Sequence, residues 1–416
     1  MTQSFDLIVI GVGMAAVTAA NKCASAGWSV AVVDELPYGG TCALRGCDPK
    51  KMLRRGAEII DAASLMNGKG IEPGSLAINW SDLMAFKRAF TEKMPPKIES
   101  GLDKNGVTTL HGSAKFIAEN IIEVDGKTRL QAKKILFVGG GFISFEFAHI
   151  AARAGSDVQI IDRGERPLKG FDPDLVDKLL ERSKEAGIEV VKKTSLISIA
   201  KEGSGYSVTL DVDGNIQEYS ADLIVHGAGR VPAIDDLDPD KAGVESDAHG
   251  VKVNEYLQSI SNPSIYAAGD AADTKGAPLT PVAVFEGKAV ASNMLKGNHA
   301  KPDYKGVPIV VFTIPELARV GMLEEEAKTA GYKLRIATND TSGWYSNLRV
   351  GETCAATKVI IDDETGKILG AYLLGPEYAE IINFFGLAMR LDLTTSELKK
   401  MVSAYPSVGS DVGSML

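Results

Sequence analysis

A glycine-rich turn between a short apolar strand and a helix occurs twice in this chain of 416 residues. In the first copy an apolar, β-branched strand over residues 6–10 enters Gly11-Val12-Gly13, and a helical stretch follows. A second strand, residues 29–33, closes on two acids. Glycines let a backbone approach a pyrophosphate, the helix N-terminus faces its charge, and the acids accept from ribose hydroxyls. We therefore expect a dinucleotide site, with an ordinary strand–helix turn as the alternative. Its residues would be Gly11, Gly13, Ala16, Asp34 and Glu35.

The second copy combines a strand over residues 135–138, three glycines, a helix and a strand over residues 157–161. Two such units suggest one bound and one diffusible dinucleotide. Asp162 favours NADH, because an acid repels a 2′-phosphate. Arg163 favours NADPH, because a guanidinium suits a phosphate, and NADPH is narrowly preferred. The residues expected at this site are Gly139, Gly141, Ser144, Asp162 and Arg163.

Two further segments concern a flavin and its redox partner. The strand over residues 264–268 ends in Gly269-Asp270, where a carboxylate could accept from a ribityl hydroxyl, although an ordinary turn has the same pattern. The segment GGTCALRGCDPKK holds Cys42 and Cys47 in a C-x4-C spacing. That spacing is wrong for zinc, and a disulfide so local would add little stability as a structural link. A redox pair is favoured, with two incidental thiols as the alternative.

These motifs together resemble the flavoprotein disulfide reductases, the family of glutathione reductase, dihydrolipoamide dehydrogenase and mercuric reductase. GGTCALRGCDPKK, GGGFISFE, HGAGRVP, SIYAAGDAAD, LTPVAVFEGKAV and FTIPELARVG follow in family order along nearly the whole chain. The resemblance implies an α/β fold with two Rossmann-like dinucleotide-binding domains and a C-terminal α+β dimerisation domain. The implied regions are an FAD domain with the cysteine pair (1–133), an NAD(P)H domain (134–232), a central domain completing the FAD site (233–303) and the dimerisation domain (304–416).

The resemblance also implies residue roles. Cys42 would be the thiol that exchanges with substrate, and Cys47 the one that contacts FAD. Cations nearby would stabilise the thiolates, with Lys50, Lys51 and Arg45 as candidates. Lys50 would pair with Glu146 near the flavin, unless the two are ordinary surface charges. Further cofactor-binding positions would be Gly40, Thr41, Lys51, Ala114, Gly269, Asp270 and, for the nicotinamide nucleotide, Gly229.

Three departures from the family pattern stand out. The linker block that usually separates the first domain from the second glycine turn is absent, because residues 131–134 pass directly into the strand at Ile135. Asp48 replaces a usual Val or Ile, and its carboxylate would raise the pKa of neighbouring thiols. Tyr405 stands where the family carries a catalytic histidine, and no histidine follows His299. Tyr405 would donate a proton from the partner subunit, or simply pack at the dimer interface.

Composition limits the remaining possibilities. The net charge of −9 disfavours non-specific binding to nucleic acid or anionic membranes, and no apolar run is long enough to span a bilayer. We expect a cytoplasmic homodimer without a metal, whose active site is shared across the interface. Three functions remain open: an NAD(P)H-dependent FAD enzyme acting through Cys42–Cys47 on a disulfide or other small acceptor, a metal-ion or quinone reductase of the same fold, and a non-catalytic dimeric scaffold.

Overall fold

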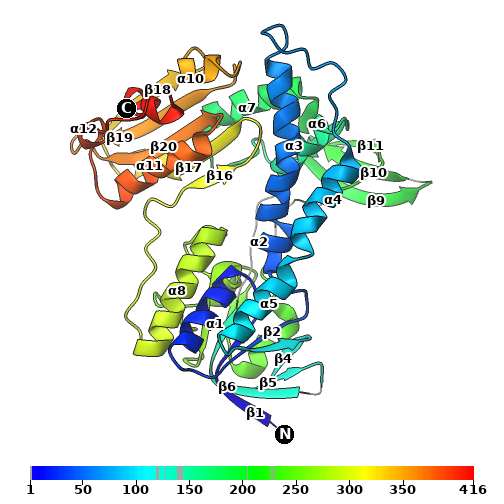
Figure 1. Cartoon of the computed structure of the whole chain (residues 1–416), viewed down its shortest axis with the longest axis vertical. Coiled ribbons are helices and arrows are strands. Elements are labelled where there is room, and N and C mark those ends of the chain that lie inside the picture. Colours follow the sequence, from blue (N-terminus) through cyan, green and yellow to red (C-terminus); the bar gives the residue numbers. More distant parts are fainter. Residues whose placement is uncertain are drawn as a thin grey trace. The chain divides into compact units, whose positions relative to one another are not determined.

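The computed structural model describes residues 2–118, 121–126, 128–137, 144–203, 205–225, 227, 229 and 231–416, with the backbone alone for 128–137. Its internal contacts divide the chain into two compact units. The first comprises residues 1–53, 81–142 and 229–304, and the second comprises residues 54–80, 143–228 and 305–416. Each unit is therefore assembled from separate stretches of sequence, as the colours of Figure 1 show.

A seven-stranded sheet forms the centre of the first unit. Its order is β3-β2-β1-β6-β5-β4, and β14 attaches to β6. The strands are β1 (Thr2–Ile10), β2 (Val30–Asp34), β3 (Thr108–His111), β4 (Ala114–Ala118), β5 (Ile121–Val124), β6 (Thr128–Phe137) and β14 (Ile265–Ala267). β1, β2, β3, β6 and β14 are parallel, whereas β4 and β5 pair antiparallel. Leu7, Ile8 and Val9 are completely buried, as the continuous apolar run of a central parallel strand requires.

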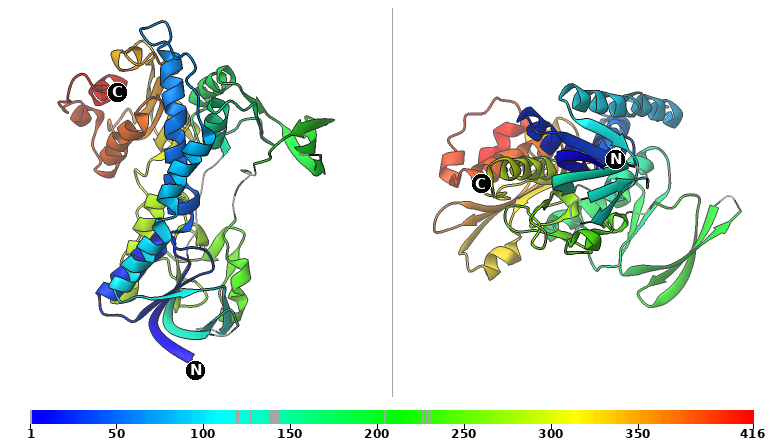
Figure 2. Two further views of the ribbon diagram at one scale, coloured as in Figure 1. Left: turned by 45° about the vertical axis from the view of Figure 1, so that its right-hand side comes forward. Right: turned by 90° about the horizontal axis from the view of Figure 1, so that it is seen from below.

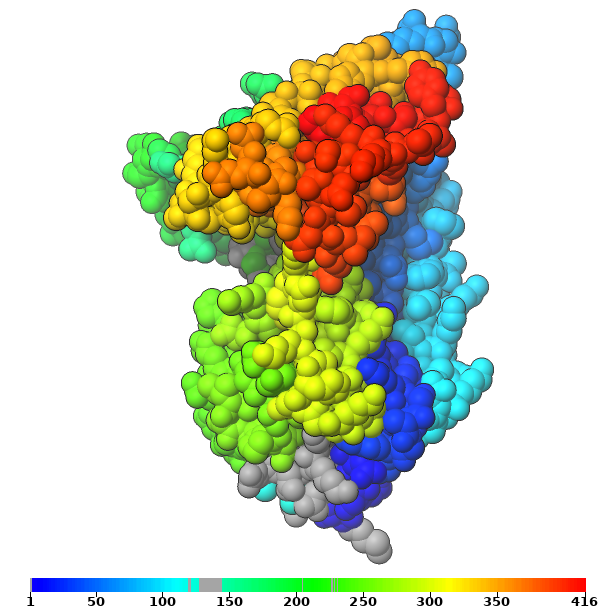
Figure 3. Space-filling view, turned by 90° about the vertical axis from the view of Figure 1, so that its left-hand side faces the viewer, coloured from blue at the N-terminus to red at the C-terminus, as the bar shows by residue number. Residues whose placement is uncertain are grey.

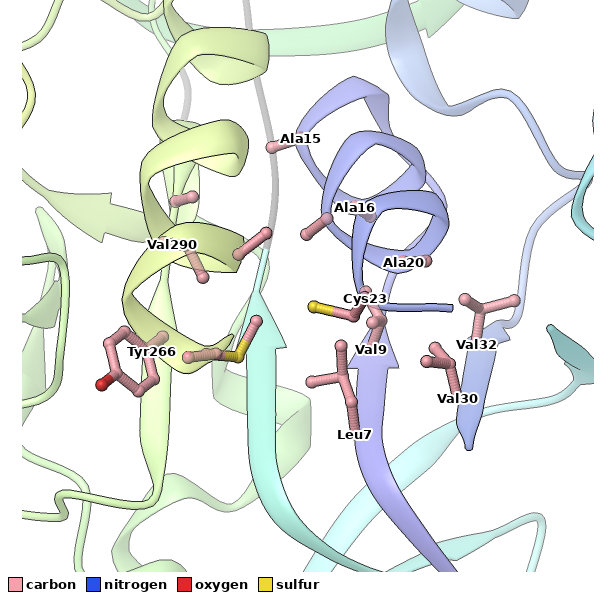
Figure 4. Packing of buried hydrophobic residues seen from close by; sticks show 14 of the residues in the cluster. Leu7, Val9, Ala15, Ala16, Ala20, Cys23, Val30, Val32, Tyr266 and Val290 are labelled. Carbon is pink, nitrogen blue, oxygen red and sulfur yellow. The ribbon is translucent and has the colours of Figure 1, made fainter. Parts of the chain in front are cut away.

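Two helices, α1 (Met14–Ser25) and α8 (Thr280–Lys296), pack side by side in the core of this unit. Figure 4 shows Ala15, Ala16 and Cys23 of α1 close to Val290 of α8. The small side chains allow a very close approach: a Cβ atom on Gly287 would lie 2.6 Å from the backbone oxygen of Ala15. Other elements of the unit are α2 (Gly40–Arg45), α4 (Trp80–Thr91), α5 (Met94–Lys104) and a small sheet of β12 (Ser246–Asp247), β13 (Gly250–Lys252) and β15 (Ala272–Asp273).

Strand β6 belongs to the sheet of the first unit over its whole described length. Lys134, Ile135 and Leu136 align with Leu7, Ile8 and Val9 of β1, and residues 135–137 pair with β14 on the other side. The sequence had assigned this segment to the second dinucleotide unit, with its domain beginning at residue 134. The structure differs because the segment satisfies its backbone hydrogen bonds between β1 and β14.

The second unit contains a parallel pair of strands, β7 (Val158–Ile161) and β8 (Ile188–Val191), with helices α6 (Ser144–Arg153) and α7 (Pro173–Glu185). Asp172 caps α7 by accepting from the backbone N–H groups of Asp174 and Leu175. An antiparallel sheet follows, formed by β9 (Thr194–Glu202), β10 (Gly205–Val212) and β11 (Asn215–Ala221). Figure 2 shows this sheet as a layer separate from β7 and β8.

The C-terminal part of the second unit is a five-stranded antiparallel sheet with helix α11 (Tyr378–Arg390) packed on it. Its strands, in sheet order, are β16 (Ile309–Val311), β17 (Glu316–Gly321), β20 (Ile368–Gly375), β19 (Ala356–Asp362) and β18 (Leu334–Asp340). Short helices complete it: α9 (Glu324–Thr329), α10 (Tyr345–Leu348), α12 (Thr395–Leu398) and the 3-10 segment Val408–Met415. Figure 3 shows residues 350–416, orange to red, as one continuous surface.

Helix α3 (Cys47–Leu65) contributes to both units, since the boundary falls between residues 53 and 54. In the second unit its Arg54 side chain is buried and donates to the backbone oxygens of Phe312 and Thr313, at 2.9 and 2.8 Å. Asp61, two turns further along α3, pairs with Arg153 at 2.6 Å and with Arg182 at 3.3 Å. Across the described ranges, no helix is long and apolar enough to cross a membrane.

Candidate active site

Cys42 and Cys47 lie on consecutive helices separated by one glycine. Cys42 is in α2, Gly46 interrupts the helix, and Cys47 begins α3. A Cβ atom on Gly46 would lie 2.9 Å from the backbone oxygen of Thr41, so the turn leaves little room for a side chain. The Cys42 thiol is partly buried and donates a hydrogen bond to the sulfur of the exposed Cys47. The local fold thus brings together the two sulfurs that the sequence pattern had paired.

The two sulfurs have opposite acidities. The hydrogen bond from Cys42 lowers the pKa of Cys47 to about 6, with help from Thr280 and the charge of Lys50. The same hydrogen bond raises the pKa of Cys42, as does its burial. Asp48 raises the pKa of both sulfurs by its negative charge, as expected from the sequence, but does not reverse this order. At neutral pH the pair therefore holds one thiolate, on Cys47, and one proton, on Cys42.

Two neighbours explain the acidity of Cys47. The Thr280 hydroxyl lies 3.5 Å from its sulfur and is on the first residue of α8, whose N-terminal end carries partial positive charge. Lys50 is one turn along α3 from Cys47 and is 7% exposed. Arg45 and Lys51, the other cations expected to act here, are exposed. The sequence reasoning missed Thr280, although the quoted motif LTPVAVFEGKAV contains it.

The first glycine turn has the geometry of a phosphate loop. Gly11 adopts a positive φ of 88°, and Gly13 caps the N-terminus of α1. A Cβ atom on Gly40 would lie 2.7 Å from the Cα atom of Gly13, so the loop before the cysteine pair closes directly over this turn. The Asp34 carboxylate accepts from the backbone N–H groups of Val12, at 2.8 Å, and Leu36, at 2.9 Å, which fixes the turn at the end of β2. These positions fit the pyrophosphate and ribose of a dinucleotide.

The Gly269–Asp270 segment that the sequence predicts at the FAD site lies where β14 ends. A cavity of about 320 Å³ is lined by Gly269, Asp270 and Glu286, among others. Glu286 of α8 is 1% exposed, and its Oε2 accepts from the backbone N–H of Gly269 at 2.6 Å. Its Oε1 accepts from the hydroxyls of Thr274, at 3.0 Å, and Tyr304, at 2.7 Å. Glu286 thus holds the Gly269–Asp270 loop in place. The only sign of this role in the sequence was an acid within the motif LTPVAVFEGKAV.

The remaining residues expected at the FAD site are in the first unit but differ in exposure. Ala16 and Ala114 are buried, in α1 and at the start of β4, whereas Glu35 is exposed just after β2. Thr41 is in α2 and is partly buried. Gly229, expected at the nicotinamide nucleotide, also belongs to the first unit and is exposed with a positive φ of 113°. Their contact with a cofactor remains a prediction.

In the second unit the residues expected to bind a nicotinamide nucleotide are only partly described. Gly139 and Gly141 lie outside the described residues. Ser144 is the first residue of α6, and its hydroxyl donates to the backbone oxygen of Gly227 at 3.1 Å. Asp162 follows β7, and its Oδ1 accepts from the backbone N–H of Gly164 at 2.6 Å. Arg163 is exposed beside it.

The second unit also has a polar cleft of about 620 Å³, and some of the residues that line it are close to Asp162 in the sequence. It is lined by Glu165, Arg166, Lys169, Asp177 and Lys192. Three cations against two acids give it a positive balance, which suits a phosphate better than a neutral ribose. Arg163, the phosphate-binding candidate of the sequence analysis, is not among the lining residues.

Two expected catalytic residues also belong to the second unit. Glu146 in α6 is 2% exposed and accepts from the backbone N–H of Phe312 at 3.0 Å, so it is not the surface acid that the sequence allowed as an alternative. Its pairing with Lys50 remains a prediction. Tyr405 is 79% exposed, which leaves its hydroxyl available to another molecule. Within the described residues, no group of three His, Cys, Asp or Glu side chains could hold a metal ion.

Comparison with known sequences identifies the family. The sequence model of the pyridine nucleotide-disulphide oxidoreductases matches residues 5–137 and 122–287, and that of their dimerisation domain matches residues 307–415. The chain belongs to this family. Its members, the class I flavoprotein disulfide reductases, use FAD with NAD(P)H as electron donor. The matches confirm the expected fold class, and the dimerisation domain supports a homodimer.

Individual relatives agree with the family assignment. A glutathione reductase from Nostoc sp. is 30% identical over 463 aligned positions that span the whole of both chains. A mercuric reductase from Lysinibacillus sphaericus is 28% identical and covers 97% of this chain and 80% of its own. The structure of the flavoprotein disulfide reductase RclA from Escherichia coli, a Cu(II) complex, superposes with a TM-score of 0.88 at 23% identity, covering 99% of both chains, which confirms the fold. Since 463 positions exceed this chain's 416 residues, the Nostoc protein has residues without a counterpart here.

Proposed function

We propose that this chain is a homodimeric FAD-containing oxidoreductase that passes electrons from NAD(P)H to the Cys42–Cys47 pair and then to a small acceptor. The observation that carries the proposal is the polarised sulfur pair. Cys42 donates to Cys47, and the pKa of Cys47 falls to about 6 within the same unit as the dinucleotide loop. Reactive cysteines need such a stabilised thiolate, whereas buried structural cysteines do not.

The pair can reduce a disulfide without an added base. The Cys42 proton moves along the hydrogen bond to the Cys47 thiolate, and the Cys42 sulfur then attacks the acceptor disulfide. This forms a mixed disulfide and releases one thiolate, which takes the proton from Cys47. The Cys47 sulfur then attacks Cys42 and releases the second thiolate. One disulfide is thus reduced to a thiol and a thiolate while the Cys42–Cys47 disulfide forms, and a hydride equivalent from NAD(P)H regenerates the starting pair.

FAD would be held by the two loops already described. Gly11, Gly13 and Gly40 leave space for the pyrophosphate, Asp34 or Glu35 accepts from the ribose, and Asp270 accepts from the ribityl chain. When bound there, FAD supplies the two-electron relay between the nicotinamide and the sulfurs. Glu286 and Thr280 are on the same helix, so α8 positions both the Gly269–Asp270 loop and the Cys47 thiolate.

NADPH is the proposed donor in preference to NADH. Arg166, Lys169 and Lys192 line the cleft close to Asp162 in the sequence, and guanidinium and ammonium groups suit a 2′-phosphate. A kcat/KM at least tenfold higher for NADH than for NADPH would contradict this choice.

Tyr405 is proposed as the proton donor to the second thiolate, the one that the Cys42–Cys47 pair releases without a proton, and solvent water then returns a proton to the phenol. In the family the corresponding tail crosses the dimer, so Tyr405 of the partner subunit would serve Cys42. A neutral phenol is a poor base but a competent acid. With Tyr405 acting only as an acid, activation of the Cys42 thiol depends on Cys47, Lys50 and Thr280.

Spectra of the reduced protein test the proposal. NADPH added anaerobically should bleach the yellow oxidised protein and produce a long-wavelength thiolate-to-flavin band. Cys47→Ser should abolish that band, whereas Cys42→Ser should show it without added reductant. Identical spectra for the two variants would refute the assignment of roles, and a purified protein without FAD would favour the non-catalytic scaffold.

A metal-ion reductase is the second candidate. It is favoured by the similarity to a mercuric reductase and by the tail that ends without histidine, because a metal ion bound by two thiolates needs no proton donor to leave. Stopped-flow reoxidation of the reduced protein by Hg(II) and by glutathione disulfide separates the candidates. Fast reoxidation by glutathione disulfide supports the disulfide reductase, and fast turnover with Hg(II) alone supports the second candidate.

A further inference from the structure

A run of exposed apolar residues precedes the C-terminal 3-10 segment of the second unit. We call residues 401–406 the apolar loop. Its exposed members are Met401, Val402, Ala404, Tyr405 and Pro406. Val402 is 97% exposed, and residues 401–407 contain no charged side chain. Single apolar residues on a surface are ordinary, whereas a continuous exposed apolar patch marks a place that a ligand or partner covers.

Both ends of the apolar loop are fixed in the core of the second unit. Leu398, at the end of α12, and Val408, at the start of the 3-10 segment, are buried in one hydrophobic cluster. The Ser407 hydroxyl donates to the backbone oxygen of Ala404 at 2.6 Å. A loop held in this way loses little conformational freedom when it is covered. Most of the favourable free energy from covering its apolar surface therefore remains for binding.

The charges that act on the sulfur pair have opposite signs. Asp48, next to Cys47 in α3, raises the pKa of both sulfurs, whereas Lys50 lowers the pKa of Cys47. An ionic substrate is steered into a site by a field of one sign. The charges that shift the two sulfurs thus favour neither an anionic nor a cationic acceptor.

We propose that the acceptor disulfide is uncharged and apolar, and that the apolar loop of the partner subunit covers it while Cys42 attacks. This inference rests on the proposed function, which brings Tyr405 of the partner subunit to Cys42. Val402 is three positions before Tyr405 and belongs to the same loop. An apolar disulfide gains free energy by leaving water against this loop, whereas an ionised one would lose hydration without meeting an opposite charge.

The reaction is the disulfide reduction given above. Cys42 and Cys47 are oxidised to their disulfide, and the acceptor disulfide is reduced to two thiols. Cys42 supplies one of the two protons, and Tyr405 supplies the other before solvent water reprotonates it. The apolar loop adds no chemical step, since it contributes only contact with the acceptor.

Three disulfides built on the same two-carbon arm test the preference. Diethyl disulfide is uncharged, cystamine is a cation and 3,3′-dithiodipropionate is an anion. Turnover by the full-length holoprotein is measured with NADPH, and each kcat/KM is divided by the rate at which dithiothreitol reduces the same disulfide. The corrected value should be at least about tenfold higher for diethyl disulfide than for either ion. A smaller ratio would overturn the inference.

Val402→Ser tests the loop itself. Because Val402 is almost fully exposed, its replacement should leave the fold of the subunit unchanged. It should lower kcat/KM for diethyl disulfide by about tenfold and leave reduction of the Cys42–Cys47 pair by NADPH as in the parent. Unaltered turnover of diethyl disulfide would show that the acceptor does not touch the loop. Dissociation of the dimer in this variant would show that the partner subunit covers the loop instead, and either result would overturn the inference.

Lys400→Gln is the matched control, because it removes an exposed charge immediately before the apolar loop. Turnover of all three disulfides should stay as in the parent. A loss confined to dithiodipropionate would show that this cation recruits an anionic acceptor, which would contradict the inference.

The same measurements separate this inference from the proposed function. If NADPH reduces the Cys42–Cys47 pair but none of the three disulfides is turned over, the proposed disulfide reduction is wrong and the inference is wrong with it. If all three are turned over and an ionic one is preferred, the proposed function is supported and only this inference is refuted.

Discussion

Replacing Thr280 with valine should make the Cys47 thiol less acidic. The Thr280 hydroxyl lies 3.5 Å from the Cys47 sulfur and lowers its pKa, and valine keeps the shape of the side chain without the hydroxyl. A hydrogen bond to a charged group contributes about 1.5–3 kcal/mol. Because Cys47 is exposed and the contact is long, we expect about 1 kcal/mol, which corresponds to about 0.7 pKa unit.

The assay is a pH titration of the reduced holoprotein through its thiolate-to-flavin band. The midpoint should rise by about 0.7 unit from the parent value of about 6 in Thr280→Val. Ser292→Ala, which removes another hydroxyl of α8 that instead contacts His299, should leave the midpoint unchanged. Equal midpoints for Thr280→Val and the parent would show that this hydroxyl does not stabilise the thiolate.

The same acidity makes the stability of the reduced protein depend on pH. The folded pKa of Cys47 is below its ordinary value of 9.0, so the thiolate stabilises the folded state fully above that value. This contribution is lost as the pH falls towards about 6. Relative to Cys47→Ser, the parent should therefore gain resistance to urea between these two pH values, and a constant difference would contradict the reasoning.

Three further predictions concern other parts of the molecule. Glu286→Ala should weaken FAD binding by about tenfold, because the Gly269 loop loses its buried acceptor, and Glu286→Gln should recover part of the affinity; equilibrium dialysis measures both. Tyr405→Phe should leave reduction by NADPH unchanged but slow reoxidation by a disulfide acceptor by about 10²-fold in stopped-flow experiments, and an unaltered rate would reduce this residue to a packing role. Asp61→Asn should lower the free energy of unfolding by about 3–5 kcal/mol in urea titrations, because the buried Arg153 loses its carboxylate partner, whereas Arg182 keeps the buried Glu352 at 4.0 Å; a loss below about 1 kcal/mol would show that water replaces the carboxylate.

Local features of the sequence were sufficient to predict the first dinucleotide loop and the sulfur pair. The positive φ of Gly11 and the contact between Cys42 and Cys47 each involve residues within a short stretch, whereas the approach of Gly40 to Gly13 joins two segments 27 residues apart. Such features depend on the residues themselves and on their neighbours in the chain. They are therefore visible in the sequence before any tertiary structure is known.

Features that depend on distant partners could not be predicted in this way. The apolar segment Ile135–Phe137 has the same β-branched and aromatic character in either sheet, so its pattern could not show that it pairs with β1 and β14. Glu286 contacts the loop at Gly269 only after α8 has packed, and Arg54 meets Phe312 across more than 250 residues of sequence. The cleft near Asp162 is lined by Arg166 and not by Arg163, and the role of Arg163 in binding a phosphate stays a prediction.

The contact between α1 and α8 limits how this protein can be changed. Gly287 lies so close to the backbone of Ala15 that even one added methyl group must push the helices apart. Because α8 also carries Thr280 and Glu286, that shift would reach the Cys47 thiolate and the Gly269–Asp270 loop together. Substitution of the small residues between α1 and α8 would therefore alter the redox properties of the Cys42–Cys47 pair, even at positions far from the sulfurs. Engineering of this protein is better directed to positions outside this contact, so that the helix pair keeps its spacing.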